Sequence, residues 1–233
     1  MFWSDVNQLV GATLLVVGAV LPVINPLGDA PLFLEMTEGC DRATRASLAR
    51  RVASYSFVLL LGSMLIGSFV LRFFDLSLGI VQVAGGAVVC ALGWKLLNQD
   101  DDPKPAGASK PPPAAPEVLD RALYPLTLPL TVDPGSISVA ITVGVTHAHG
   151  IRSAVIKLVA AIVASGLIAL SISLTYRNAW RLKSWLGQRW MGIVIRLSAF
   201  IVLCIGVQII WNGTKALGAE VGIQERVAPA RGR

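Results

Sequence analysis

Long stretches without any charged residue constrain the fold of this 233-residue chain more than any other feature. Five of them contain no Asp, Glu, Lys or Arg: residues 6–28, 52–71, 76–94, 158–176 and 197–214. A sixth stretch, 122–151, contains only Asp133. Uncharged apolar runs of about 18 or more residues match the hydrocarbon core of a bilayer. The sequence therefore predicts an all-α integral membrane protein with six transmembrane helices.

The basic residues lie between these stretches and predict an orientation. Of the 20 Lys and Arg residues, twelve lie in loops one, three and five. Seven lie in the N-terminus, loops two and four, and the C-terminal tail. Because Lys and Arg are enriched in cytoplasmic loops, loops one, three and five are predicted to be cytoplasmic and both termini outside. The net charge of +6 is thus explained by topology, so we expect membrane lipid, and no nucleic acid, as a partner.

Two of the apolar stretches are interrupted by Pro and Gly beside a polar residue. The first interruption is Asn25-Pro26-Leu27-Gly28 and the second is Asp133-Pro134-Gly135. Pro removes a backbone donor and Gly admits backbone angles that other residues resist. Because unpaired backbone groups are costly in hydrocarbon, such breaks are tolerated only inside protein or beside a polar cavity. Broken helices at Asn25-Pro26 and Asp133-Pro134 therefore predict a site, with the helix after the first break resuming near Asp29.

The two halves of the chain resemble each other. Asn25-Pro26 corresponds to Asp133-Pro134, Gln82 to Arg196, and Cys90 to Cys204. Since each half has three spans, the second half is expected to enter the membrane upside down, as in transporters with inverted repeats. The predicted parts are a three-helix repeat at 1–98, a Pro-rich linker at 99–119, a second three-helix repeat at 120–218 and a disordered tail at 219–233.

Backbone amides at the two breaks are candidates for binding an anionic group. The first amides of a helix have no intrahelical partner, and the helix dipole favours negative charge there. We therefore predict substrate binding by Asn25, Gly28, Gly135, Ser136 and Ser138, with the two serines adding hydroxyl donors. The alternative is that both breaks are capped kinks, with Asn25 serving only as a helix cap.

Asp133 is a candidate for binding a substrate ammonium group or a coupling proton. An ionisable residue at membrane depth suggests function, whereas the alternative is an N-cap for the helix that contains Ser136. Arg196 is a possible charge partner that could instead extend to the interface, and Gln82 is a candidate for a polar contact.

Catalysis finds no support in the sequence. His147 and His149 have no nearby third metal ligand, and the three cysteines are too widely spaced to suggest a metal site or a disulfide framework. No pattern indicates a nucleophile–base pair or a phosphate-binding loop. We therefore expect no enzyme activity, no metal and no cofactor, other than a possible coupling ion, H⁺ or Na⁺.

At the two breaks the chain resembles the MarC family of six-span inner-membrane proteins. Residues 25–33, NPLGDAPLF, together with Thr37, are similar to the first motif of that family. Residues 125–130, PLTLPL, followed by PGSIS at 134–138, are similar to the second. The resemblance covers most of residues 1–218 and implies a bacterial inner-membrane location and, for some members, transport of glycine and alanine. One departure is Asp133, where the family usually has Gly.

These observations lead to a functional hypothesis. We expect a secondary transporter of small neutral amino acids or similar small zwitterions that works by alternating access between the two faces of the membrane. The alternatives are an exporter of another small metabolite, or a non-transporting membrane scaffold whose linker and tail bind partners. No oligomeric state is predicted.

Overall fold

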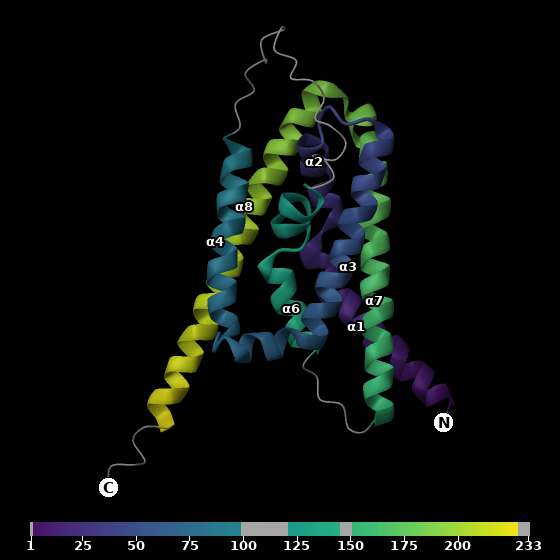
Figure 1. The fold of residues 1–233 in the computed structure, drawn as a ribbon. Coiled ribbons are helices and arrows are strands. Elements are labelled where there is room, and N and C mark those ends of the chain that lie inside the picture. Colours follow the sequence, from purple (N-terminus) through teal and green to yellow (C-terminus); the bar gives the residue numbers. More distant parts are fainter. Residues whose placement is uncertain (1, 99–120, 145–150, 228–233) are drawn as a thin grey trace.

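The chain is helical throughout the part that the structure describes. The computed structural model describes residues 2–98, 121–144 and 151–227. The elements in chain order are α1 (Phe2–Ile24), α2 (Pro26–Met36), α3 (Arg42–Phe73), α4 (Leu78–Leu97), η1 (Ala122–Thr131), α6 (Pro134–Gly144), α7 (Ile151–Asn178) and α8 (Trp180–Val227). No strand occurs in these three ranges, and Figure 1 shows the helices gathered into one bundle. The predicted all-α class is confirmed.

Six segments of the bundle correspond to the six predicted spans. Five helical segments are long and apolar enough to cross a membrane: Trp3–Ile24, Arg42–Phe73, Leu78–Leu97, Arg152–Asn178 and Gly192–Ala219. The sixth is the pair η1 and α6, which are bent by 73° at a short break and together pass the same test. The predicted architecture of long apolar helices with a broken helix at Asp133-Pro134 is therefore confirmed.

The distribution of polarity is that of a membrane protein, with an apolar exterior and polar groups inside. Phe69 and Phe73 on α3 are 68% and 83% exposed, and Trp211 on α8 is 59% exposed. Asp29 and Asp133 are each only 7% exposed. Polar groups at membrane depth are tolerated when they face the interior of the bundle, so the interior is the place to look for a site.

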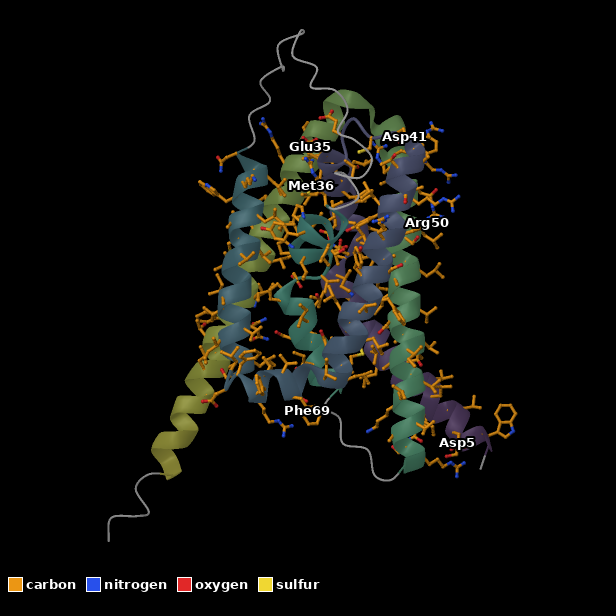
Figure 2. The ribbon with its side chains drawn as sticks, in the orientation of Figure 1. Asp5, Glu35, Met36, Asp41, Arg50 and Phe69 are labelled. Atoms are coloured by element: carbon orange, nitrogen blue, oxygen red, sulfur yellow. The ribbon has the colours of Figure 1, made fainter. Side chains whose placement is uncertain are left out.

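Charged side chains gather at the two ends of the bundle. Figure 2 shows Glu35 and Asp41 at one end and Asp5 at the other, where Asp5 forms an ion pair with Arg152. The helix α1 begins and α8 ends at the end that holds Asp5 (Figure 1). The helix α8 continues to Val227, beyond residue 218, where the sequence analysis expected the ordered chain to stop. The predicted linker at 99–119 lies outside the described residues.

The break between α1 and α2 occupies a single residue. Asn25 has a left-handed backbone conformation, with φ 42° and ψ 61°, which Asn tolerates better than most residues. Pro26 then starts α2, because a Pro at the first helical position has the right φ and needs no amide partner. The helix thus resumes at Pro26, not near Asp29 as predicted from the sequence.

The segment η1 is wound more loosely than an α-helix. Pro125 and Pro129 lack amide protons, and the backbone is non-helical just before each of them, at Tyr124 and Leu128. Two threonine hydroxyls supply donors instead. Thr127 donates to the Ala122 carbonyl at 2.6 Å, and Thr131 donates to the Leu126 carbonyl at 2.7 Å. The broken span is therefore irregular over its first half as well as at Asp133.

Small residues bring α4 and α8 into backbone contact. Three antiparallel pairs repeat every seven residues along the contact: Gly79 with Gly213, Gly86 with Gly206, and Gly93 with Ala199. A Cβ on Gly86 would lie 2.8 Å from the Gly206 carbonyl oxygen, and a Cβ on Gly206 would lie 3.0 Å from the Gly86 carbonyl oxygen. We call this contact the glycine seam. Such close packing is a common way for membrane helices to associate. The antiparallel pairing is compatible with the predicted inverted repeat, which stays a prediction.

Candidate functional site

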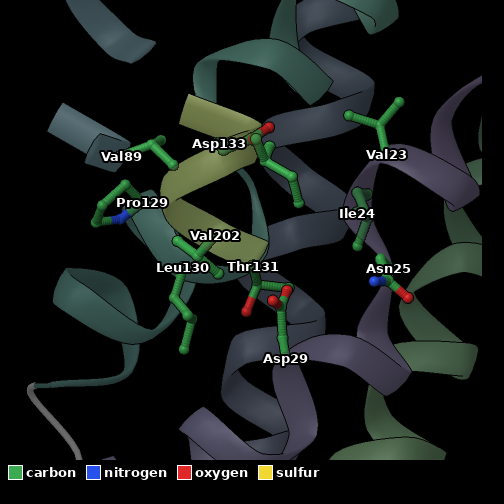
Figure 3. A pocket seen from close by; sticks show the side chains of 11 residues that line it. Val23, Ile24, Asn25, Asp29, Val89, Pro129, Leu130, Thr131, Asp133 and Val202 are labelled. Carbon is green, nitrogen blue, oxygen red and sulfur yellow. The ribbon is translucent and has the colours of Figure 1, made fainter. Parts of the chain in front are cut away.

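The two helix breaks meet at one cavity in the middle of the bundle. Asn25 and Asp29 line it from the first break, and Thr131 and Asp133 line it from the second (Figure 3). Val89 of α4 and Val202 of α8 complete the wall. The cavity measures about 20 Å³, which is room for about one water molecule. Breaks that are far apart in the sequence thus line one small chamber whose wall is partly polar.

Asn25 caps the helix that follows it. Its Oδ1 accepts a hydrogen bond from the Gly28 amide at 3.3 Å, and the Gly28 amide also donates to the Asn25 carbonyl at 3.0 Å. A Cβ at Gly28 would lie 2.2 Å from Asn25 Nδ2, so a larger residue there would displace the capping side chain. The capping role considered as an alternative is therefore present, and Asn25 lines the cavity as well.

Asp133 caps α6 in a similar way. Its Oδ1 accepts a hydrogen bond from the Ser136 amide at 2.6 Å, and the Ser136 hydroxyl donates to the Asp133 carbonyl at 2.8 Å. The Ser138 hydroxyl donates to the Pro134 carbonyl at 2.7 Å. Both serines are buried, and neither lines the central cavity. In this conformation their hydroxyl protons are used within the helix itself.

The second break is fitted closely against α4 and α8. A Cβ on Gly85 of α4 would lie 2.1 Å from Pro134 Cβ, and a Cβ on Gly135 would lie 2.8 Å from Ile209 Cδ1 of α8. The role of Gly135 in the structure is therefore close packing. The position of Asp133 depends on this fit.

Asp29 is a cavity residue that the sequence analysis did not single out. It lies in the first turn of α2, is 7% exposed, and shares the cavity with Asp133, with which it interacts electrostatically. The sequence analysis considered Asp133 as the acidic candidate for the site and named Asp29 only as the point near which the helix resumes. The signal was present in the sequence, because Asp29 follows Asn25 by about one helical turn in the first motif.

Thr131 and Tyr176 extend the polar cluster toward α7. The two hydroxyl oxygens are 2.9 Å apart, and the Tyr176 ring stacks on Phe33 of α2 with centroids 4.4 Å apart. Figure 3 shows the Thr131 and Asp29 side chains pointing toward each other. Tyr176 is fully buried, so it fixes Thr131 at the edge of the cavity. The sequence analysis treated both residues only as parts of spans.

The other predicted polar residues lie away from the cavity. Arg196 on α8 is exposed, and Gln82 on α4 is half-buried, with its Cβ 2.9 Å from where a Cβ on Gly213 would lie. Neither lines the cavity. His147 and His149 lie outside the described residues. Among the residues that are described, no group of three His, Cys, Asp or Glu side chains could hold a metal ion.

Two larger cavities lie toward opposite ends of the bundle. One, of about 680 Å³, is bounded by the C-terminal ends of α2 and α4 and by η1, and is lined by Glu35, Lys95 and Arg121 among others. Pro129 lines both this cavity and the central one. The other, of about 440 Å³, lies among α1, α3, α6 and α7 and is mostly apolar apart from Lys157. We call these two larger cavities vestibules; the first shares Pro129 with the central cavity, and the second shares no lining residue with it.

Comparisons with known proteins point to one family. The sequence profile described as MarC family integral membrane protein matches residues 11–217. The UPF0056 membrane protein YvbG of Bacillus subtilis (strain 168) is 28% identical over 200 residues, which cover 85% of this chain and 92% of YvbG. The UPF0056 inner membrane protein MarC of Citrobacter koseri is 28% identical over 216 residues, which cover 90% of this chain and 95% of that protein. No solved structure matches the chain with statistical significance.

Proposed function

Because the chain belongs to the MarC family of integral membrane proteins, we propose that it is a secondary transporter of small neutral amino acids or similar small zwitterions. The observation that carries this proposal is that both helix breaks line one small, partly polar cavity between two vestibules. Broken helices that meet near the midplane form the substrate sites of many secondary transporters. We further propose a location in the bacterial inner membrane, since the Citrobacter koseri relative is named an inner membrane protein.

Transport would proceed by alternating access to the central cavity. A cavity of about 20 Å³ is too small for even a small amino acid, so it must widen toward one vestibule at a time. The vestibule beside Glu35, Lys95 and Arg121 lies at the ends of the helices that adjoin loops one and three. In the predicted topology that vestibule faces the cytoplasm, and the apolar one faces outside.

The chemistry of the cavity suits a zwitterion. The carboxylates of Asp29 and Asp133 attract an ammonium group. The first amides of α2 and α6 attract a carboxylate, provided that the Asn25 and Asp133 side chains release the amides of Gly28 and Ser136. The proposal involves no catalytic step, no metal and no cofactor apart from a coupling ion, H⁺ or Na⁺.

Uptake of radiolabelled glycine and alanine into proteoliposomes tests the proposal. We expect saturable uptake by the wild type and a marked loss in Asp133→Asn and Asn25→Gly, where Gly keeps the left-handed backbone but removes the side chain. The matched control is Asp75→Asn, because Asp75 is exposed between α3 and α4 and shares the positive φ of Asn25. Equal uptake by empty liposomes and wild type, under proton and sodium gradients alike, would overturn the amino-acid substrate.

Two alternatives remain distinguishable by experiment. An exporter of another small metabolite would show no glycine or alanine uptake but would still use the cavity residues. A scaffold would depend on the Pro-rich linker instead. Deleting residues 103–116 should leave transport unchanged, whereas loss of the cellular phenotype with transport intact would favour the scaffold.

A further inference from the structure

Asp29 is a buried carboxylate that has no hydrogen-bond donor among the described residues. It is 7% exposed and lines the central cavity, and within the described residues no donor reaches it. The nearby Thr131 hydroxyl is engaged by the Leu126 carbonyl and by Tyr176. Buried carboxylates are strongly unfavourable unless they are paired or neutralised. The structure therefore leaves Asp29 in need of a positively charged partner.

Asp133 does not share this need. It is equally buried, at 7% exposed, but its Oδ1 accepts the Ser136 amide at 2.6 Å at the start of α6. A hydrogen bond from a helix N-terminus stabilises a carboxylate. Of the two carboxylates in the cavity, Asp29 is thus the one that is available to bind a ligand.

Among the described residues, no other element facing Asp29 supplies a positive charge. Asp133 faces it from the second break, and Tyr176 interacts with it from α7. The helices α4 and α8 contribute the apolar side chains of Val89 and Val202. No Lys, Arg or His is among the described residues that line the cavity. The cavity therefore selects a small cation.

We propose that Asp29 is the cation-binding residue of the site and exchanges a proton for the ammonium group of the substrate. This assignment rests on the proposed transport function and gives it a coupling ion. The Asp29 carboxyl group releases its proton to water that enters from a vestibule, and the carboxylate then binds the ammonium group through charge-assisted hydrogen bonds. One positive charge leaves as another enters. At the opposite face, substrate release returns a proton to Asp29.

Infrared spectroscopy of the purified protein tests the proton-binding half of the proposal without any substrate. We expect a carbonyl stretch of a protonated carboxyl group that is present in wild type and in Asp133→Asn, and absent in Asp29→Asn. In Asp29→Glu the band should persist but should no longer shift when aspartate alone is labelled with ¹³C. That variant keeps the test valid if Asp29→Asn fails to fold. An unchanged, aspartate-derived band in Asp29→Glu would overturn the assignment.

Proton release measured with a pH-sensitive dye in weak buffer tests the exchange. Methylammonium, glycine and alanine are added separately, with potassium chloride as the ionic-strength control. We expect proton release from wild type and from the exposed control Asp75→Asn, and its loss in Asp29→Asn. Release by methylammonium but not by the amino acids would support the ammonium site and overturn the amino-acid substrate. No release by any of the three from wild type would overturn the exchange.

Discussion

The glycine seam makes a quantitative prediction about stability. In Gly86→Ala, the new Cβ would lie 2.8 Å from the Gly206 carbonyl oxygen and 2.9 Å from the Ile210 amide nitrogen. Both are backbone atoms, so no side-chain rotation relieves the clash and α4 and α8 must move apart. Overpacking of this kind costs about 1 to 3 kcal/mol. The gain of up to about 1 kcal/mol in helix propensity from Gly to Ala is too small to offset it.

The matched control, Gly166→Ala, is expected to change the stability in the opposite direction. At Gly166 on α7, nothing lies within 4 Å of an added Cβ, so Gly166→Ala keeps the propensity gain without a clash. We would measure thermal unfolding of both variants and the wild type in the same detergent. Gly86→Ala should unfold at a temperature several degrees below wild type, and Gly166→Ala at or above it. If the two variants were equally stable, the seam would not hold α4 against α8.

Three further predictions use other parts of the structure. Tyr176→Phe keeps the stacking on α2 but loses a buried hydrogen bond, so the free energy of unfolding should fall by about 1 kcal/mol in the same unfolding assay. Hydrogen bonds from the Thr44 side chain and amide hold the pKa of Asp41 below its usual value. The stabilisation that the ionised Asp41 side chain gives the folded state is therefore present at neutral pH and is lost as pH falls through the folded-state pKa. Asp41 is the N-cap of α3, so Asp41→Asn should flatten the acid side of a plot of unfolding temperature against pH, and an unaltered plot would refute a stabilising role for this cap. In a cysteine-free background, Glu38→Cys should react with an impermeant thiol reagent only after permeabilisation and Asp75→Cys in intact cells, whereas the reverse pattern would invert the predicted topology.

The membrane fold was predictable because it depends on composition over long windows. Charge-free runs identify spans through solvation, which needs no knowledge of tertiary contacts. The breaks were also predictable, since Pro and Gly act on the local backbone at Asn25 and Asp133. That the two breaks meet could be predicted only by assuming an inverted arrangement of the two halves. In the structure both breaks line the same cavity.

The residues missed were those whose roles depend on packing. Asp29 was taken as the polar start of a second helix, because sequence position does not show that α2 is enclosed by its neighbours. Thr131 became visible only once Tyr176 of α7 was placed against it. Arg196, considered as a charge partner for the site, has an exposed side chain that does not line the central cavity. The loose winding of η1 follows from Pro125 and Pro129, and the threonine hydroxyls that compensate for them donate to carbonyls within the same segment.

The single-residue break at Asn25 ties the rotational phase of α2 to that of α1. Each residue of an α-helix turns the chain by about 100°, so inserting or deleting one residue at the break would swing Asp29 out of the cavity and bring a neighbouring side chain toward it. The second break, between Thr131 and Pro134, contains two residues and has more freedom to absorb such a change. The number of residues between α1 and α2 therefore determines the site as much as the identity of its residues does. A chain that kept every residue of the first motif but changed the length of its break would lose the chamber.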